Sequence, residues 1–156
     1  VAPTAWQVAD VVPTGAEKVR FDETFVRKAM SADLVTLARR AAFAPVRDEN
    51  RKCDRSDERV NFNFAVTRPG FGYGFARCVL VSDCDQVVQA AYGADWWGRV
   101  FVNGEESLPF GSGWKPREFA LRLRKGKNEI LAVTHCGSLQ HWFTFYTNLS
   151  SGDDNE

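Results

Sequence analysis

The chain has 156 residues, of which 44% are hydrophobic and 26% are charged, values that are ordinary for one soluble globular domain. Lysine plus arginine equals aspartate plus glutamate, at 20 each, so the composition favours neither nucleic acid nor an anionic membrane as a partner. No apolar run is long enough to cross a bilayer.

The N-terminal third predicts short elements. Residues 1–16 carry Trp6 and several valines before a proline and a glycine, a pattern typical of an opening strand that ends in a turn. Residues 17–21 are expected to form a second short strand. The apolar spacing in 31–43 predicts a short helix with Ser31 as its N-cap, and we expect one or two short helices before residue 46.

Residues 46–59 are almost wholly charged and predict a solvated or disordered loop, because such a run cannot bury a face. After this loop, apolar and polar residues alternate with period two. The expected strands are 59–66, 73–81, 85–92, 99–104, 117–124, 128–135 and 142–149. Short alternating strands separated by Gly, Asn and Asp predict an all-β fold, an antiparallel β-sandwich. We expect one domain over 1–149 and a polar tail or linker over 150–156.

Eight apolar side chains in these strands are expected to form much of the core. They are Phe62, Phe64, Val79, Val88, Phe101, Leu121, Ile130 and Phe145.

The turns should separate into two kinds if successive strands run up and down the sandwich. One end would collect the tight polar turns 82–83, 103–104 and 125–128, which offer no chemistry. The other end would collect longer glycine-rich loops with unusual aromatic and imidazole side chains. These side chains are Phe71, Trp96, Trp97, Trp114, His135, His141 and Trp142.

Three segments resemble a known family. They are "YGFARCVLVSDCDQVVQAAYGADWWGRVFVNGEE" (73–106), "FALRLRKGKNEILAVTH" (119–135) and "HWFTFYTNL" (141–149). An aspartate before a strand of the form "VFVNGE" and the later "LRKGKNEI" hairpin are similar to galactose-binding-like β-jelly-roll domains. The likeness covers residues 60–149 well and 1–45 loosely. It implies a jelly-roll sandwich of the type that accompanies bacterial glycoside hydrolases, often as a carbohydrate-binding module.

The candidate carbohydrate-binding residues are Asp95, Trp96, Trp97, Arg99 and Trp114. Successive side chains on a strand point to opposite faces, so the two adjacent tryptophans should divide between the core and the rim, although both could be core. Asp95 meets sugar hydroxyls or, as we favour, caps its loop. Trp114 lies in "GSGWKP" and is the best candidate for exposure. An exposed indole suits the apolar face of a pyranose.

The remaining candidates have structural interpretations that we favour. Trp142 begins a strand and should be core. Arg77 and Arg99 could bind a sugar or a carboxylate, but charged strand residues usually mark the solvated face. His135 and His141 are expected to be solvated loop residues, because no third metal ligand stands near them. The residues specify no cofactor and no set of metal ligands. The resemblance allows a structural calcium ion in the loops.

The four cysteines, Cys53, Cys78, Cys84 and Cys136, match no zinc spacing. We expect free and partly buried thiols, with a disulfide neither indicated nor excluded.

Three functions compete. The first is a non-catalytic carbohydrate-binding module for a poly- or oligosaccharide, excised from a secreted bacterial polysaccharide-degrading enzyme whose catalytic domain belonged to the same chain. The second is a structural accessory domain of a glycoside hydrolase without a ligand. The third is a small sugar-acting esterase or lyase. The resemblance implies a secreted, extracellular or periplasmic location, although the sequence begins with no signal peptide. No G-x-S-x-G or H-E-x-x-H motif is present, so we expect no enzyme.

Overall fold

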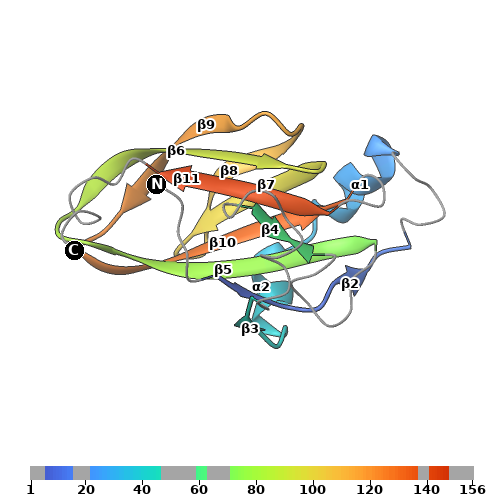
Figure 1. Cartoon of the computed structure of the whole chain (residues 1–156), viewed down its shortest axis with the longest axis horizontal. Helices are drawn as coiled ribbons and strands as arrows, with labels where there is room; N and C mark the ends of the chain where they lie inside the picture. The colour runs from blue at the N-terminus through green and yellow to red at the C-terminus, as the bar shows by residue number, and fades with distance from the viewer. Residues whose placement is uncertain (1–5, 16–21, 47–58, 63–70, 137–140, 148–156) are drawn as a thin grey trace.

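The fold, seen in a computed structural model, is mainly antiparallel β-sheet arranged in two sheets (Figure 1). The structure describes residues 6–15, 22–46, 59–62, 71–136 and 141–147. The short strand expected at 17–21, most of the charged segment 46–59 and the tail 150–156 lie outside these residues. Within the described residues, no helix is long and apolar enough to span a membrane.

The larger sheet carries most of the strands. Its order is β3 (Ala44–Pro45), β1 (Gln7–Val8), β5 (Gly72–Ser82), β10 (Gly126–His135), β7 (Trp97–Val102) and β8 (Glu105–Ser112), and β2 (Val12–Pro13) also pairs with β5. The strand β8 was not predicted. Its sequence "EESLPFGS" lacks clean alternation and holds a proline, which an edge strand tolerates because its outer N–H groups need no partner.

The smaller sheet lies against the larger one. Its order is β4 (Arg59–Asn61), β11 (Trp142–Thr147), β6 (Gln86–Ala94) and β9 (Arg117–Leu123). The chain changes sheet between β5 and β6 and again between β6 and β7, so strands that are consecutive in sequence face each other across the interior. The predicted strands from residue 73 onward are therefore present, and they form two layers.

An inner core fills the space between the two sheets. The Trp6 ring meets the Phe143 ring edge-on, with centroids 5.1 Å apart, and the Phe145 ring at 5.8 Å. Five of the predicted core residues belong here: Phe62, Val88, Leu121, Ile130 and Phe145. Burial of these side chains is the main source of stability, at about 1.5–3 kcal/mol for each large apolar side chain. Phe64 lies outside the described residues.

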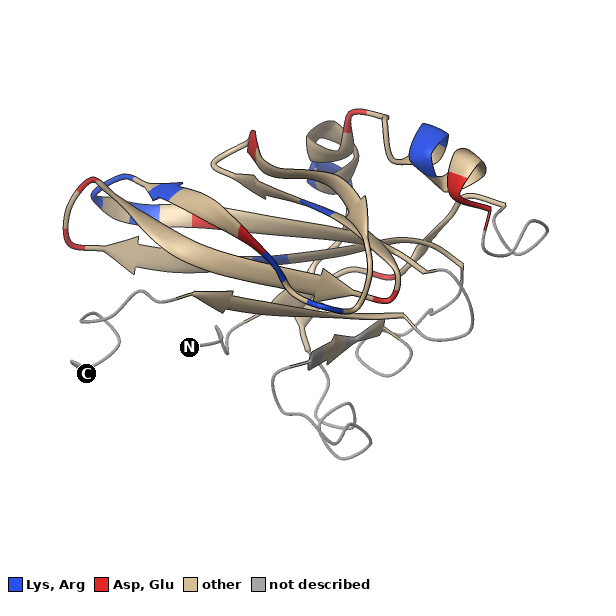
Figure 2. Cartoon of the chain, turned by 90° about the horizontal axis from the view of Figure 1, so that it is seen from above, with Lys and Arg blue, Asp and Glu red and all other residues tan. Residues whose placement is uncertain are grey.

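An outer core lies on the opposite face of the larger sheet, beneath two short helices. These are α1 (Glu23–Ala29) and α2 (Leu34–Arg39), which lie together on one side of the strands (Figure 2). They bury Val26, Met30 and Leu34 against the sheet, and Phe101 is buried here as predicted. The larger sheet is therefore apolar on both faces over part of its area.

The helix ends correct the N-terminal prediction. The predicted helix starts later than expected, because Asp33 is the N-cap of α2 and accepts a hydrogen bond from the Thr36 backbone N–H at 3.1 Å. Ser31 is not an N-cap. It follows α1, and its hydroxyl donates to the Lys28 carbonyl at 2.6 Å. The helix α1, capped by Asp22, agrees with the expected one or two short helices before residue 46, but its position was not predicted.

Val79 was wrongly assigned to the core. Side chains on β5 alternate between the faces, so Cys78 points into the inner core and Val79 points outward. The helices cover Tyr73 and Phe75 on this outward face, but Val79 is 55% exposed. Sequence alternation does not show where the covering helices stop.

The register places the turns at the two ends that the sequence predicted. Gly126 pairs with Ser82, and Asn103 N–H donates to the Glu129 carbonyl at 2.9 Å, so the tight turns share one end. We call this the turn end. At the opposite end His135 pairs with both Tyr73 and Trp97. We call this end the rim, and its described residues are 93–98, 111–117, 135–136 and 141–142.

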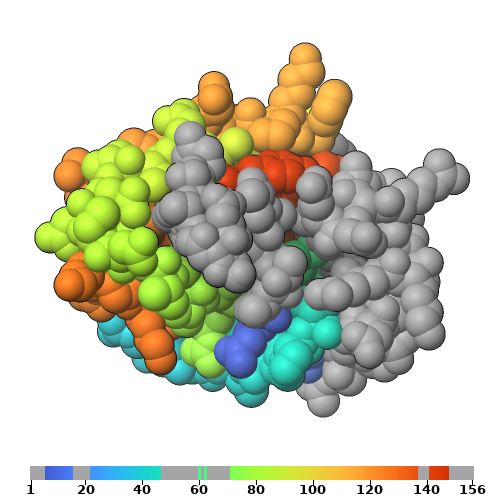
Figure 3. Space-filling view, turned by 60° about the vertical axis from the view of Figure 1, so that its left-hand side comes forward, coloured from blue at the N-terminus to red at the C-terminus, as the bar shows by residue number. Residues whose placement is uncertain are grey.

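The turn end is compact. Figure 3 brings it forward and shows the yellow-green surface of the β5–β6 turn beside the orange surface of the β9–β10 turn. The Lys125 backbone N–H donates to the Asp85 carboxylate at 2.7 Å and joins these two turns.

Candidate functional site

Backbone hydrogen bonds lock two rim loops together. Gly113 N–H donates to the Trp96 carbonyl at 2.8 Å, and Ala94 N–H donates to the Gly113 carbonyl at 3.3 Å. Gly93 lies beneath this contact. A Cβ at that position would lie 2.5 Å from the Trp114 carbonyl oxygen, so the close approach requires glycine. The loop that carries Trp114 is therefore fixed against the end of β6.

The Asp95–Trp96 segment is also anchored through its backbone. Asp95 N–H donates to the Trp142 carbonyl at 2.9 Å, and Trp96 N–H donates to the His135 carbonyl at 3.2 Å. The peptide bond between Asp95 and Trp96 is cis. Both side chains are half-buried. Whether the Asp95 carboxylate caps its loop or meets a ligand stays a prediction.

Trp114 is the exposed aromatic side chain of the rim. Its exposed fraction is 55%, which confirms the exposure predicted from its Gly- and Pro-flanked context. The Lys115 ammonium lies 5.8 Å from the centroid of the Trp114 ring. A large flat apolar surface therefore faces solvent beside a cation.

The two adjacent tryptophans have different surroundings. Trp97 is only 1% exposed, its indole N–H donates to the Glu23 carboxylate at 3.2 Å, and its ring meets the His135 ring edge-on at 6.4 Å. Trp96 is half-buried and packs against the outer core. The burial of Trp97 removes its ring from the candidate stacking surfaces. In this structure it holds α1 against the sheet.

Glu23 is the first residue of α1 and the partner of Trp97. The Trp97 indole N–H, followed by Arg27, lowers the pKa of the Glu23 carboxyl below its ordinary value. Both partners favour the carboxylate because they bond the charged form. Glu23 is thus an ionised anchor for the start of the helix.

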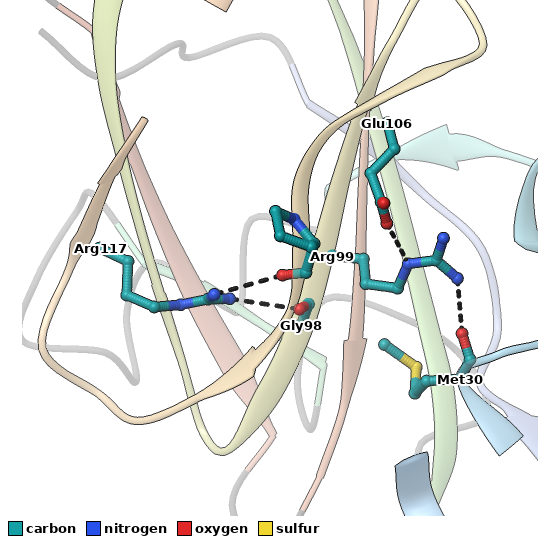
Figure 4. A network of polar contacts seen from close by, with 6 residues as sticks. Met30, Gly98, Arg99, Glu106 and Arg117 are labelled. Carbon is teal, nitrogen blue, oxygen red and sulfur yellow. Dashed lines mark hydrogen bonds and ion pairs between the residues drawn. The ribbon is translucent and has the colours of Figure 1, made fainter. Parts of the chain in front are cut away.

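Arg99 connects β7, β8 and α1, as Figure 4 shows. Its Nε donates to the Glu106 carboxylate at 2.6 Å, and its Nη1 donates to the Met30 carbonyl at 2.6 Å. The guanidinium carbon also lies 4.8 Å from the Phe101 ring centroid. Arg99 does not mark a solvated face, since its side chain is only 17% exposed. These contacts give it a role in the fold.

Arg117 occupies the other side of the same strands (Figure 4). Its guanidinium donates to the Pro109 carbonyl at 3.2 Å and to the Gly98 carbonyl at 3.3 Å. Gly111 makes room for it, because a Cβ there would lie 2.1 Å from Arg117 Nη1. No sequence pattern predicted a role for Arg117 or Lys115, although Lys115 follows the exposed tryptophan directly.

The two histidines are buried, so the expectation of solvated loop histidines was wrong. His135 Nδ1 bonds the Cys136 carbonyl at 3.0 Å and its Nε2 bonds the Thr14 hydroxyl at 2.8 Å. A carbonyl only accepts, so Nδ1 carries the proton, and burial lowers the pKa of the imidazole. His141 Nε2 bonds the Thr134 hydroxyl at 3.0 Å.

Trp142 and Arg77 both belong to the framework. Trp142 is buried in the interior, as predicted. Arg77 donates from Nε to the Gln7 side-chain oxygen at 3.0 Å, and its guanidinium carbon lies 4.2 Å from the Phe43 ring centroid. Arg77 therefore joins the opening strand to the segment after α2.

The cysteines of the described residues are free thiols. Cys78 and Cys136 are buried and Cys84 is exposed, whereas Cys53 lies outside the described residues. Burial raises the pKa of the Cys78 thiol to about 12, so this group is not a reactive thiolate. The described part of the chain gathers no three His, Cys, Asp or Glu side chains as metal ligands. A structural calcium ion stays a prediction.

A groove of about 740 Å³ lies at the turn end, between the edges of β8 and β9. It is lined by charged side chains that include Asp85, Glu106 and Arg122. Its described lining residues include three carboxyls and no aromatic ring. Asp85 accepts a backbone bond and Glu106 pairs with Arg99, which leaves Glu105 as the third. We place the candidate site at the rim, because a sugar platform needs an exposed ring and an acid pair for hydrolysis needs two uncommitted carboxyls.

Comparison with known proteins identifies no family for this chain. No family model matches the chain, and no curated protein sequence matches it. Among solved structures, the selenomethionine-labelled beta-glucosidase from Kluyveromyces marxianus is 18% identical, with a TM-score of 0.44, over 56% of this chain and 12% of that chain. The same enzyme in complex with glucose gives 18% identity and a TM-score of 0.41 over 62% and 14%. The chain thus spans a small part of these enzymes, and TM-scores below 0.5 do not establish a shared fold.

Proposed function

We propose that this chain is a non-catalytic carbohydrate-binding domain of jelly-roll type, whose rim stacks a poly- or oligosaccharide on Trp114. The observation that carries the proposal is the exposed Trp114 ring on a loop that is fixed by backbone hydrogen bonds. Tryptophan is highly buried on average, so a half-exposed ring on a loop held by backbone hydrogen bonds favours a ligand surface over packing.

The physical case rests on preorganisation. A pyranose presents an apolar face of C–H groups, which matches an indole ring, and an aromatic contact adds about 0.5–1.5 kcal/mol beyond its area. Because the loop is already fixed, binding loses less conformational entropy in this loop. Asp95 and Trp96 lie on the neighbouring loop, bonded to Gly113, and can contribute an acceptor for hydroxyls and a second apolar edge. Trp97 and Arg99 contribute indirectly, because they hold α1 against the strands that carry the rim.

A single stacking platform predicts weak binding. We expect dissociation constants of roughly micromolar to millimolar, which several modules on one chain would strengthen through avidity. The proposal places the domain beside a catalytic domain of a secreted bacterial polysaccharide-degrading enzyme, as the sequence resemblance implies.

A glycan array or an affinity-gel screen of the isolated domain, followed by calorimetry, tests the proposal. Trp114→Ala should weaken retention about tenfold or more, because it removes the platform. Val81→Ala is the matched control, since it truncates a similarly exposed apolar side chain on β5 near the turn end and should leave retention unchanged. Unchanged affinity for Trp114→Ala would move the site elsewhere.

One observation favours a second candidate, a structural accessory domain without a ligand. Trp97 and Arg99 hold α1 onto the sheet instead of facing solvent. This candidate predicts that no glycan in the screen retains the wild-type domain. The third candidate, a small sugar-acting esterase or lyase, is not supported by the groove at the turn end.

A further inference from the structure

Lys115 is the cation of the rim that faces solvent. It is exposed, it follows Trp114 in the fixed loop, and its ammonium lies 5.8 Å from the Trp114 ring centroid. No carboxylate of the described residues forms an ion pair with it. Its charge therefore lies over one face of the proposed platform.

Two arginines at or next to the rim, Arg99 and Arg117, differ from Lys115. Arg99 is paired with Glu106 and bonded to the α1 terminus, and Arg117 donates to two backbone carbonyls. Both guanidinium groups hold strands and helix together. Asp95, the carboxylate of the neighbouring loop, is half-buried. The exposed charge next to the exposed indole is thus positive.

We propose that the rim takes sugars that carry a carboxylate, as in uronate polysaccharides, and that Lys115 pairs with that carboxylate while the pyranose stacks on Trp114. This inference rests on the proposed function. A carboxylate on a pyranose lies at the periphery of the ring, where the flexible side chain of a lysine next to the indole can reach it. The ammonium offers three donors on a flexible stem, and its contact with the ring is weak, about 0.5–1 kcal/mol, so a ligand can draw it away.

The test compares each acid polymer with its ester, in which an added alkyl group neutralises the carboxylate. Affinity-gel retardation is measured with polygalacturonate against its methyl ester, and with alginate against its propylene glycol ester. We expect the wild-type domain to prefer at least one acid polymer over its ester by about two- to fivefold, the range of an exposed ion pair. The preference should vanish at about 1 M salt, where the Debye length is about 3 Å.

Variants assign the preference to Lys115. Lys115→Gln should bind acid and ester equally, Lys115→Arg should keep the preference, and Trp114→Ala should lose retention on both polymers. Lys127→Gln is the matched control, because it removes the same charge from an exposed position on β10 at the turn end and should behave like wild type.

The outcomes separate the two proposals. Equal retention of the wild-type domain on acid and ester, or a preference that survives Lys115→Gln, overturns the uronate inference and leaves sugar binding intact. If neither these polymers nor the neutral glycans of the screen retain the wild-type domain, sugar binding itself is wrong and the inference falls with it.

Discussion

Hydrogen bonds hold both the turn end and the rim, but the groups that they hold differ. At the turn end the buried Asn128 side chain bonds the Arg124 backbone N–H and carbonyl, at 2.9 Å each, and also meets the Asn103 amide at 3.0 Å. The polar side chains at the turn end are therefore used in hydrogen bonds within the protein. At the rim the backbone bonds hold a loop whose side chains, Trp114 and Lys115, face solvent.

The difference indicates which end is built for recognition. Tight turns need only satisfy their own backbone, and hairpins do so with Asn and Gly. A fixed loop that presents a large aromatic ring contributes little to folding. Functional residues are often carried on loops that a rigid scaffold positions, and the rim fits that arrangement.

The largest effect should come from comparing two tryptophans of the same rim. Trp97→Ala should lower the free energy of unfolding by about 3–5 kcal/mol, because it empties a buried site beneath α1. Trp114→Ala should change it by no more than about 0.5 kcal/mol, as expected for an exposed position. Denaturant unfolding measures both, and equal losses would show that Trp114 is a packing residue.

The next effect belongs to the turn end. Asn128→Ala should lower the free energy of unfolding by about 1–3 kcal/mol, because it leaves part-buried backbone groups at Arg124 without their partner. Lys127→Ala, at the neighbouring exposed position, should stay within about 0.5 kcal/mol. Sugar retention should not change in either variant, and a loss of retention would place the site at the wrong end.

A smaller effect should follow from His135 beneath the rim. Burial lowers the pKa of His135 in the folded protein, and its hydrogen bond to the Cys136 carbonyl only partly offsets this. The unfolded chain therefore binds a proton more readily, so the stabilisation is complete above the ordinary histidine pKa and falls as the pH drops below it. Urea unfolding between pH 8 and pH 5 measures this decline. A His135→Gln variant should decline less, and an identical decline would exclude His135 as its source.

The sequence predicted features that depend on local pattern. Period-two alternation predicted the strands around Val88, Ile130 and Phe145, and strand direction alone sorted the turns into two ends. The exposure of Trp114 followed from flanking residues that supply no apolar period. Each of these three features is determined by residues that are close together in the sequence.

Other features depend on contacts between distant segments. Trp97 and Phe75 are buried because helices fold over the larger sheet, while Val79 on the same face lies beyond them. His135 is buried with a hydroxyl partner, Thr14, that is 121 residues away. Alternation shows which side chains share a face, but it does not show which part of that face another element covers.

The most direct test of the rim is a titration followed through amide and indole N–H signals by nuclear magnetic resonance, with the oligosaccharide that the screen selects. The account predicts that the Trp114 indole signal shifts with the ligand, while the buried Trp6 indole and the Asn103 and Lys127 amides at the turn end do not. Shifts confined to the turn end, or a Trp114 signal that stays fixed while the ligand binds, would contradict it.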